Sequence, residues 1–548
     1  MEGGKYLEFL KMDDKQIFDK IGYSVKIWFE ILSEIQDPQL KQNMKERIYQ
    51  YVKHTGITGF SQEEIKSILT SEQILDCTEA RITKFCDRVA NEDYGDDSSM
   101  PIITKLDMNS ILMYIKDMEI NDDKKIELMN RVIKAINEKD YSNVQDINAE
   151  IIYDLLKSNP YLADKLMQEH SDRIPPYFFK YIEISKNPEY ILRKAEQFYE
   201  ENIQIGIDPR IQLGLEIEAN HRIPIKINLW EQKGFLHYKE YDEATIAVGR
   251  EVACPPIHDK PEELSKVCAL IETLAEEGFY YDEESGNAAG QINIGLDYLN
   301  STRSVINFYE IFGNCEELLL HICNVQGQLT RQQIYGNSRF NPISEIIGTQ
   351  VIDEDIDRIE LLKLLYPSND EHIQGLEYKK NTVGIRDLFH PKKARLEIKF
   401  PNGSLDYRVW IDNMRLFGKM VEMSRRLAEI QKKDDITPEE EHLLWLKENL
   451  SNPDSTLEDK LYDLMDLLFE EDEIKNIYID RFYALEQKIK ETGTKKYDYP
   501  RYEYEGRGKM FGTVDFQQQY KSQIETGRLI SYNPETGIYK EDGKEERI

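Results

Sequence analysis

Cysteine is scarce in this chain, and its spacing excludes the usual cysteine-based sites. The 548 residues contain six cysteines, with no Cys-x-x-Cys pair and no metal-ligand spacing toward histidine. Sparse and irregular cysteines in a long chain are typical of reduced, structural thiols in the cytosol. We therefore expect reduced thiols and a cytoplasmic location.

Long apolar runs and an excess of basic residues are also absent. No stretch reaches the length of about eighteen apolar residues that a transmembrane helix needs, and Met1 to Lys5 carry no apolar signal core. The 70 Lys and Arg residues face 102 Asp and Glu residues, for a net charge of −32. Because nucleic acids and anionic membranes attract clustered basic residues, we expect neither as a partner. The negative net charge does not exclude a small anionic substrate, since a local site can be cationic.

The patterning that is present predicts an α+β protein with four regions. Residues 1–206 show helical periodicity throughout and predict a helical N-terminal domain. Residues 207–430 alternate strand-like segments with helices, which is typical of the α+β class. Residues 431–493 return to helices, with Thr437 as a predicted N-cap. Residues 494–548 form a Tyr-rich tail, partly extended, in which 529–532 and 538–540 are expected to pair.

Three segments predict strands with polar residues two positions apart. These residues are Glu216 and Glu218, then Gln291 and Asn293, and finally Arg395, Glu397 and Lys399. Alternation along a strand places each set on one face. If the strands share a sheet, its polar face combines carboxylates, amides and cations, as a site for Mg²⁺ and phosphate requires. The alternative is an amphipathic sheet with one solvated face, which antiparallel sheets often show.

Further segments join these strands in an ordered set of motifs. The motifs are Gly214-Leu215-Glu216-Ile217-Glu218, Glu251-Val252-Ala253-Cys254-Pro255-Pro256, Ala289-Gly290-Gln291-Ile292-Asn293-Ile294-Gly295, and Leu396-Glu397-Ile398-Lys399-Phe400-Pro401-Asn402-Gly403-Ser404. Over about residues 207–430 this order resembles the amidoligase family, the carboxylate–amine ligases related to glutamine synthetase and glutamate–cysteine ligase. The family's last three segments typically read Glu-Val-Val-Ser-Pro, Gly-Gly-His-Ile-His-Ile-Gly and Val-Glu-Phe-Arg-Leu-Pro-Asn-Gly-Thr.

The resemblance implies a fold, a reaction and a set of site residues. The implied fold is a glutamine-synthetase-like antiparallel sheet domain flanked by all-helical regions. The implied reaction uses ATP and Mg²⁺ to form an acyl phosphate that an amine then attacks, on a peptide or protein among other substrates. By position, the metal ligands would be Glu216, Glu218, Glu251 and Glu397, the catalytic residues Asp242, Arg331 and Lys399, and the cofactor-binding residues Gln291, Asn293 and Arg395.

Three departures from the family pattern keep a second hypothesis open. Gln291 and Asn293 stand where the family has histidines, Lys399 replaces an arginine, and Asp242-Glu243-Ala244 replaces Asp-Gly-Ser. The alternative is a non-catalytic relative that binds nucleotide, or a protein partner through its helical flanks. Gly403 is interpreted as supplying the backbone freedom of a turn.

Overall fold

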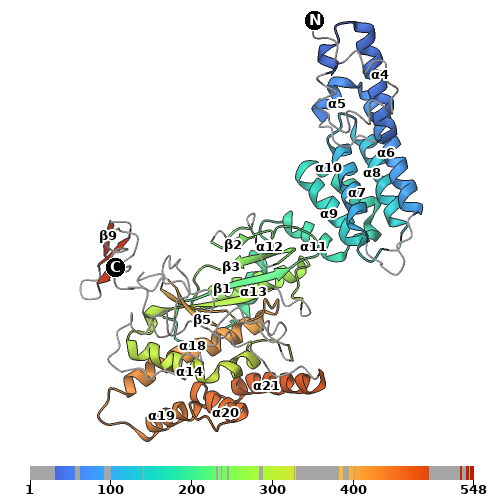
Figure 1. Ribbon diagram of the computed structural model, residues 1–548. Coiled ribbons are helices and arrows are strands. Elements are labelled where there is room, and N and C mark those ends of the chain that lie inside the picture. The colour runs from blue at the N-terminus through green and yellow to red at the C-terminus, as the bar shows by residue number, and fades with distance from the viewer. Residues whose placement is uncertain are drawn as a thin grey trace, which may run out of the picture. The chain divides into compact units, whose positions relative to one another are not determined.

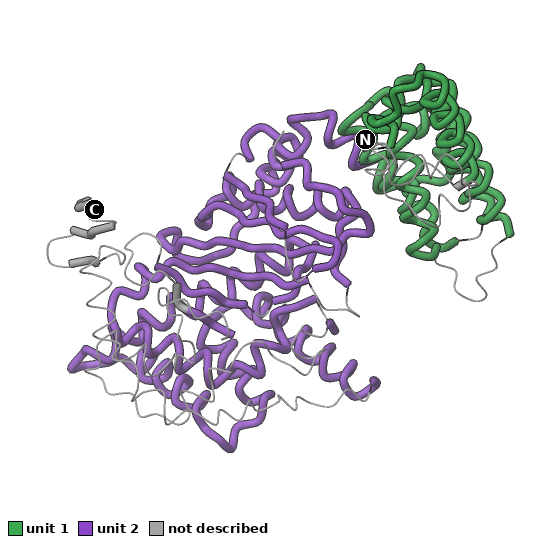
Figure 2. The backbone as a smooth tube through the Cα atoms, turned by 45° about the horizontal axis from the view of Figure 1, so that its top comes forward, with its two compact units in different colours: residues 1–179 green, residues 180–548 purple. Residues whose placement is uncertain are grey.

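The chain, described here by a computed structural model, forms two compact units, residues 1–179 and 180–548 (Figure 2). The structure describes residues 31–55, 62–91, 100–139, 141–229, 232–235, 237–242, 246–282, 288–325, 327–328, 382–386, 394–399, 401–492, 531–533, 538–541 and 544–547.

The first unit is built from helices over the residues described in it. They are α4 (Pro38–Thr55), α5 (Gln62–Ile68), α6 (Ser71–Asn91), α7 (Ile102–Lys116), α8 (Asp122–Asn137), α9 (Val144–Ser158), α10 (Pro160–Glu169) and the short η2 (Ser171–Arg173). Apolar residues recur with the helical period, so each helix has one face to bury. In α8 this face contains Met129, Val132 and Ile136, all fully buried, and Asn121 caps the helix by accepting from the N–H of Lys124 at 2.8 Å.

The second unit combines helices with a sheet. They are α12 (Tyr190–Glu200), α13 (Pro261–Glu276), α14 (Thr302–Ile322), α18 (Tyr407–Ile430), α19 (Pro438–Leu450), α20 (Leu457–Leu468) and α21 (Asp472–Thr492), with the short η3 (Leu296–Tyr298), while α11 (Pro176–Ser185) spans the division between units. No helix in the described part of the chain has the length and apolarity needed to cross a membrane.

The division between the units lies ahead of the predicted boundary at residue 206. It falls between residues 179 and 180, because α12 packs closely on α13 and so belongs with the sheet. Lys194 of α12 forms ion pairs of 2.8 Å with both Glu272 and Glu276 of α13. The helix that precedes the sheet is therefore part of the sheet's own unit.

An antiparallel sheet of six strands lies at the centre of the second unit (Figure 1). Its strands are β1 (Leu213–Asn220), β2 (Lys239–Tyr241), β3 (Gly249–Ala253), β4 (Gly290–Gly295), β5 (Val383–Arg386) and β6 (Arg395–Ile398). Their order is β2-β3-β1-β4-β6-β5, and every neighbouring pair is antiparallel. This combination of helices with an antiparallel sheet confirms the predicted α+β class.

The sheet has an apolar face and a polar face. Fully buried side chains of the apolar face are Leu215, Ile217, Ile292, Ile294 and Leu396. Helix α18 covers this face, because Trp410 packs against Gly290, which lies opposite Ile217 in the sheet. A Cβ on Gly290 would lie 2.0 Å from the Trp410 ring, so only glycine permits this approach. The opposite face, called the polar face below, points away from α18. It carries the polar side chains of the three predicted patterns, which are Glu216, Glu218, Gln291, Asn293, Arg395, Glu397 and Lys399.

The helices that follow α18 belong to the same unit. Helix α19 begins with the predicted capping box: Thr437 Oγ1 accepts from the N–H of Glu440 at 3.2 Å, and a Glu440 carboxylate oxygen accepts from the N–H of Thr437 at 3.1 Å. Buried Arg481 of α21 donates to Asp412 of α18 and to the carbonyl oxygen of Ile322 at the end of α14. These contacts attach α21 to the two helices that support the sheet.

A second, small antiparallel sheet lies at the C-terminal end of the chain. It contains β7 (Ser531–Asn533), β8 (Ile538–Glu541) and β9 (Lys544–Arg547) in that order. Ser531 pairs with Lys540 and Tyr532 with Tyr539, which confirms the predicted pairing for residues 531–532, while residues 529–530 lie outside the described part of the chain.

Candidate functional site

The carboxylates of β1 lie opposite polar partners in both neighbouring strands. Glu216 lies opposite Gln291 of β4, and Glu218 lies opposite Glu251 of β3. Residues directly opposite in antiparallel strands are side-chain neighbours on one face of the sheet. All four side chains are half-buried on the polar face. The strand pairing therefore brings together residues that lie up to 75 positions apart in sequence.

Two amides of β4 hold the carboxylate of Glu216. Gln291 Nε2 and Asn293 Nδ2 each donate to Glu216 Oε1 at 3.1 Å. Gln291 Nε2 also donates to Asn293 Oδ1 at 2.8 Å, so the three side chains form a closed triangle. Gln291 and Asn293 occupy the positions where the resembling family carries histidines. In this structure the two amides orient Glu216, and their role toward a cofactor stays a prediction.

Glu397 is buried and is neutralised by Arg395 of β6 and by Lys399, which directly follows β6. Its side chain is 4% exposed, with Arg395 Nη2 2.9 Å from Oε1 and Lys399 Nζ 2.8 Å from Oε2. Side chains two positions apart on a strand point the same way, which explains the contact. Both carboxylate oxygens are engaged, so Glu397 anchors Arg395 and Lys399. A role for Glu397 as a metal ligand, as predicted, would require these ion pairs to rearrange.

The backbone around Ala289 holds the second carboxylate of β1. The N–H of Ala289 donates to Glu218 Oε2 at 2.8 Å, and the N–H of Glu218 donates to the Ala289 carbonyl at 2.9 Å. Gly403 packs on the same backbone: a Cβ there would lie 1.9 Å from the Glu218 carbonyl oxygen. The interpretation of Gly403 as a source of turn freedom is wrong, because its φ is not positive. Glycine is required there by the close approach to β1.

Of the other predicted catalytic residues, Asp242 lies off the polar face. Asp242 follows β2, its side chain is 90% exposed, and it forms an ion pair with Arg250. Arg250 lies opposite Ala219 and is adjacent to Glu251 along β3, so its side chain points to the opposite side of the sheet. Asp242 is thus held away from the site by Arg250. Arg331 lies outside the described residues.

The polar face is divided by charge. Glu216, Glu218 and Glu251 form an acidic half on β1 and β3, and Arg395 and Lys399, bridged by Glu397, form a cationic half on β6. The neutral amides of β4 lie between the two halves. With neighbouring strands about 4.8 Å apart, β3 and β6 are separated by about 14 Å. The face therefore presents negative and positive charge within the span of one small ligand.

The acidic half fits a magnesium ion that shares its coordination with a substrate. Among the described residues, no three His, Cys, Asp or Glu side chains come together closely enough to hold a metal ion by themselves. Mg²⁺ commonly uses one or two protein carboxylates and completes its shell with water and substrate phosphates. Glu218 and Glu251, directly opposite each other, provide that number. Like charges in opposed positions repel, and a cation between them would remove this cost.

Two groups at the site were not anticipated from the sequence. Tyr241 of β2 lies opposite Glu251 at the edge of the sheet and is 44% exposed. Its strand has three residues, too few to establish an alternation in the sequence. The sequence also could not show that the main-chain N–H of Ala289 donates at the site, because residue type does not reveal which main-chain groups point there.

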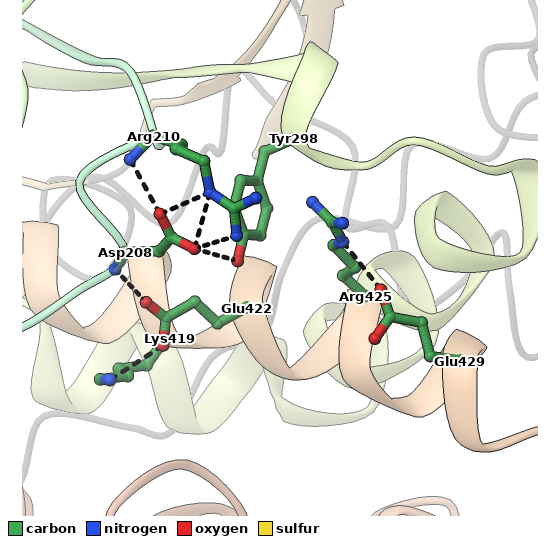
Figure 3. A network of polar contacts seen from close by, with 7 residues as sticks. All are labelled: Asp208, Arg210, Tyr298, Lys419, Glu422, Arg425 and Glu429. Atoms are coloured by element: carbon green, nitrogen blue, oxygen red, sulfur yellow. Dashed lines mark hydrogen bonds and ion pairs between the residues drawn. The ribbon is translucent and has the colours of Figure 1, made fainter.

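A separate polar network fixes the chain where it enters β1 (Figure 3). Asp208 accepts hydrogen bonds of 3.0 Å from Arg210 Nε and the Tyr298 hydroxyl, and its N–H donates to Glu422 of α18. Arg425 lies over the Tyr298 ring, 4.9 Å from its centre. The Arg210 guanidinium holds the pKa of Asp208 well below its usual range, while burial, together with Asp208, raises the pKa of Tyr298 to about 12. These cations are paired with carboxylates, which indicates a structural role.

Comparison with known proteins adds no assignment to this geometry. No protein-family model matches the chain, and no match was found among curated proteins.

Proposed function

We propose that this protein is an ATP- and Mg²⁺-dependent ligase that joins a carboxylate to an amine, on a small molecule, a peptide or a protein. The observation that carries the proposal is the division of the polar face into an acidic half on β1 and β3 and a cationic half at β6, with only β4 between them. Phosphoryl transfer depends mostly on positioning and on neutralising phosphate charge, which these two halves provide. An antiparallel sheet with helices on its apolar side supports a glutamine-synthetase-like fold.

Each half has a distinct role in this proposal. Glu218 and Glu251 would hold Mg²⁺, with Glu216 beside them on β1, and the ion would supply positive charge against the phosphate oxygens. Lys399 and Arg395 stabilise the oxygens of the transferred phosphoryl group. Ion pairs to the buried Glu397 carboxylate keep both cations pointed at the site, so little reorganisation is needed during the reaction.

The reaction is a condensation coupled to ATP cleavage. The substrate carboxylate attacks the γ-phosphorus of ATP, ADP leaves, and an acyl phosphate forms. The amine then attacks the acyl carbon, inorganic phosphate leaves, and the amine loses a proton as the amide forms. For this chemistry the face must bind an anionic nucleotide and a carboxylate close together, which requires a cationic half in an otherwise acidic protein.

A second function is favoured by the way the charges are satisfied. Glu397 is neutralised by Arg395 and Lys399, and Glu216 receives hydrogen bonds from two amides, so much of the polar face is satisfied by its own residues. This arrangement suits a non-catalytic relative that binds nucleotide without turnover, or a protein partner through its helical flanks.

Turnover separates the two functions. Release of ADP is measured with ATP and Mg²⁺ over panels of amines and carboxylates, for the wild-type protein, Glu218→Gln and the control Asp242→Asn. A ligase shows ADP release that needs both substrates, is lost in Glu218→Gln, and persists in Asp242→Asn because Asp242 pairs on the opposite side of the sheet. No ADP release on any pair, with nucleotide binding intact, supports the non-catalytic function instead.

A further inference from the structure

A buried turn lies directly beside the acidic half of the polar face. Residues 401–404 make main-chain hydrogen bonds to residues 288–290: the N–H of Gly290 donates to the Pro401 carbonyl at 2.7 Å, and the N–H of Gly403 donates to the Ala288 carbonyl at 3.3 Å. The segment 288–290 in turn holds Glu218 through Ala289, as described above. The turn is therefore linked to the Glu218 carboxylate through the main chain of residues 288–290.

One of the side chains that hold the turn comes from a distant part of the sequence, while Trp410 Nε1 donates to the Ser404 carbonyl at 2.7 Å. Asn324, two residues beyond the end of α14, accepts the N–H of Asn402 through its Oδ1 at 2.8 Å. Asn324 and Asn402 are 2% and 1% exposed. A buried main-chain N–H without a partner is costly, so loss of the Asn324 oxygen would force the turn to move or to open toward water.

The end of α14 is independently held in place. Asn413 of α18 donates to the Cys323 carbonyl at 2.6 Å, and Arg481 of α21 donates to the Ile322 carbonyl at 3.3 Å. The Nδ2 of Asn324 has no hydrogen-bond partner among the described residues. Within the described residues, the Asn324 side chain therefore makes one hydrogen bond, and this bond is to the turn. Its role differs in this respect from that of a helix cap, which would bind the end of α14.

We propose that Asn324 is a positioning residue for the metal-binding carboxylate of Glu218. The inference rests on the proposed function, because it assigns Asn324 to the Mg²⁺ site. The path runs from Asn324 to the N–H of Asn402, through the paired segments 401–403 and 288–290, to the N–H of Ala289 and the Glu218 carboxylate. Asn324 itself touches neither metal nor substrate.

A matched control lies within α14, the helix that ends two residues before Asn324. Asn307 is 0% exposed, donates to the Ser424 carbonyl at 3.2 Å and to Gln431 at 3.0 Å, and also has one amide atom without a partner in the described structure. It lies seventeen positions before Asn324, which is about 25 Å along a helix. Asn307→Ala therefore tests the loss of a buried asparagine far from the turn.

The experiment uses the full chain and the non-hydrolysable analogue AMP-PNP, titrated with Mg²⁺. Asn324→Ala is expected to raise the Mg²⁺ concentration for half-maximal nucleotide binding at least tenfold, while Asn307→Ala changes it less than twofold. Amide hydrogen exchange provides a second readout without ligand: exchange in residues 213–220 and 288–295 is expected to increase in Asn324→Ala and to stay at the wild-type level in Asn307→Ala.

Each outcome decides one of the two proposals. Equal effects of both variants on Mg²⁺ dependence, or none from Asn324→Ala, would overturn the positioning role. If wild-type protein binds no AMP-PNP with Mg²⁺, the proposed function fails and so does the assignment of Asn324 to a metal site. Exchange then shows whether Asn324 still holds Glu218: unchanged exchange in Asn324→Ala refutes the path itself.

Discussion

Replacement of Glu397 by glutamine should destabilise the sheet strongly, although it changes only one atom. The carboxylate is 4% exposed and contacts Arg395 at 2.9 Å and Lys399 at 2.8 Å, and the Lys399 side chain is itself only 10% exposed. Glutamine keeps the shape and one acceptor, but it leaves both cations without a counter-charge, and its NH₂ group would face one of them.

The expected size of the effect follows from these contacts. Removal of one partner from a buried ion pair costs about 3–5 kcal/mol, because the remaining charge stays uncompensated. Arg395 is 24% exposed and can recover some hydration. We therefore expect a loss near the lower limit, about 3 kcal/mol of unfolding free energy. Glu216→Gln is the control: its amide oxygen still accepts from Gln291 and Asn293, so it should cost about 1 kcal/mol.

Urea unfolding followed by circular dichroism measures the unfolding free energy of both variants against wild type. Where the two units unfold at different urea concentrations, each transition is fitted separately. The reasoning requires Glu397→Gln to unfold at clearly lower urea than Glu216→Gln. A Glu397→Gln variant within about 1 kcal/mol of wild type would refute the view that Glu397 anchors the cationic half.

Three further predictions concern the framework of the site. Gly403→Ala should cost about 1–3 kcal/mol, because its Cβ would lie 1.9 Å from the Glu218 carbonyl; a neutral effect in urea unfolding would contradict the close approach. Glu277 directly follows α13, is fully buried and accepts a hydrogen bond of 2.7 Å from Asn228 Nδ2. Burial raises the pKa of Glu277 from 4.5 to about 8, so its contribution to stability is present below pH 4.5 and is lost as the pH rises to about 8. Glu277→Gln should remove this loss, which is of the order of 5 kcal/mol. The unfolding free energy of the variant relative to wild type should therefore rise between pH 5 and pH 8.5. Identical pH dependence of the two urea midpoints would refute this prediction. Asp242→Asn should leave Mg²⁺-dependent nucleotide binding within twofold of wild type, and a larger loss would return Asp242 to the site.

The strand pattern of the site was predictable because alternation is a geometric property of the backbone. Polar residues two positions apart had to share a face, and the structure joins Glu216, Gln291 and Asn293 by hydrogen bonds. The helix start at Thr437 was equally local, since a capping box involves residues within one turn.

The remaining features depend on contacts between distant residues. Burial of Glu397 between two cations follows from its place in the folded sheet, and the sequence pattern alone also allowed a free metal ligand. Gly403 is required because the turn meets β1, which lies about 185 positions earlier. Asp242 was assigned from its place beside a motif, whereas its ion pair with Arg250 holds it on the other side of the sheet.

The most direct test of the central claim is calorimetric binding of AMP-PNP with and without Mg²⁺, on wild-type protein and on Glu218→Gln. The account predicts binding that requires Mg²⁺ and falls at least tenfold in Glu218→Gln, with unfolding of the variant close to that of wild type. No binding to the wild-type protein, or Mg²⁺-independent binding that Glu218→Gln leaves unchanged, would contradict a nucleotide–metal site on the polar face.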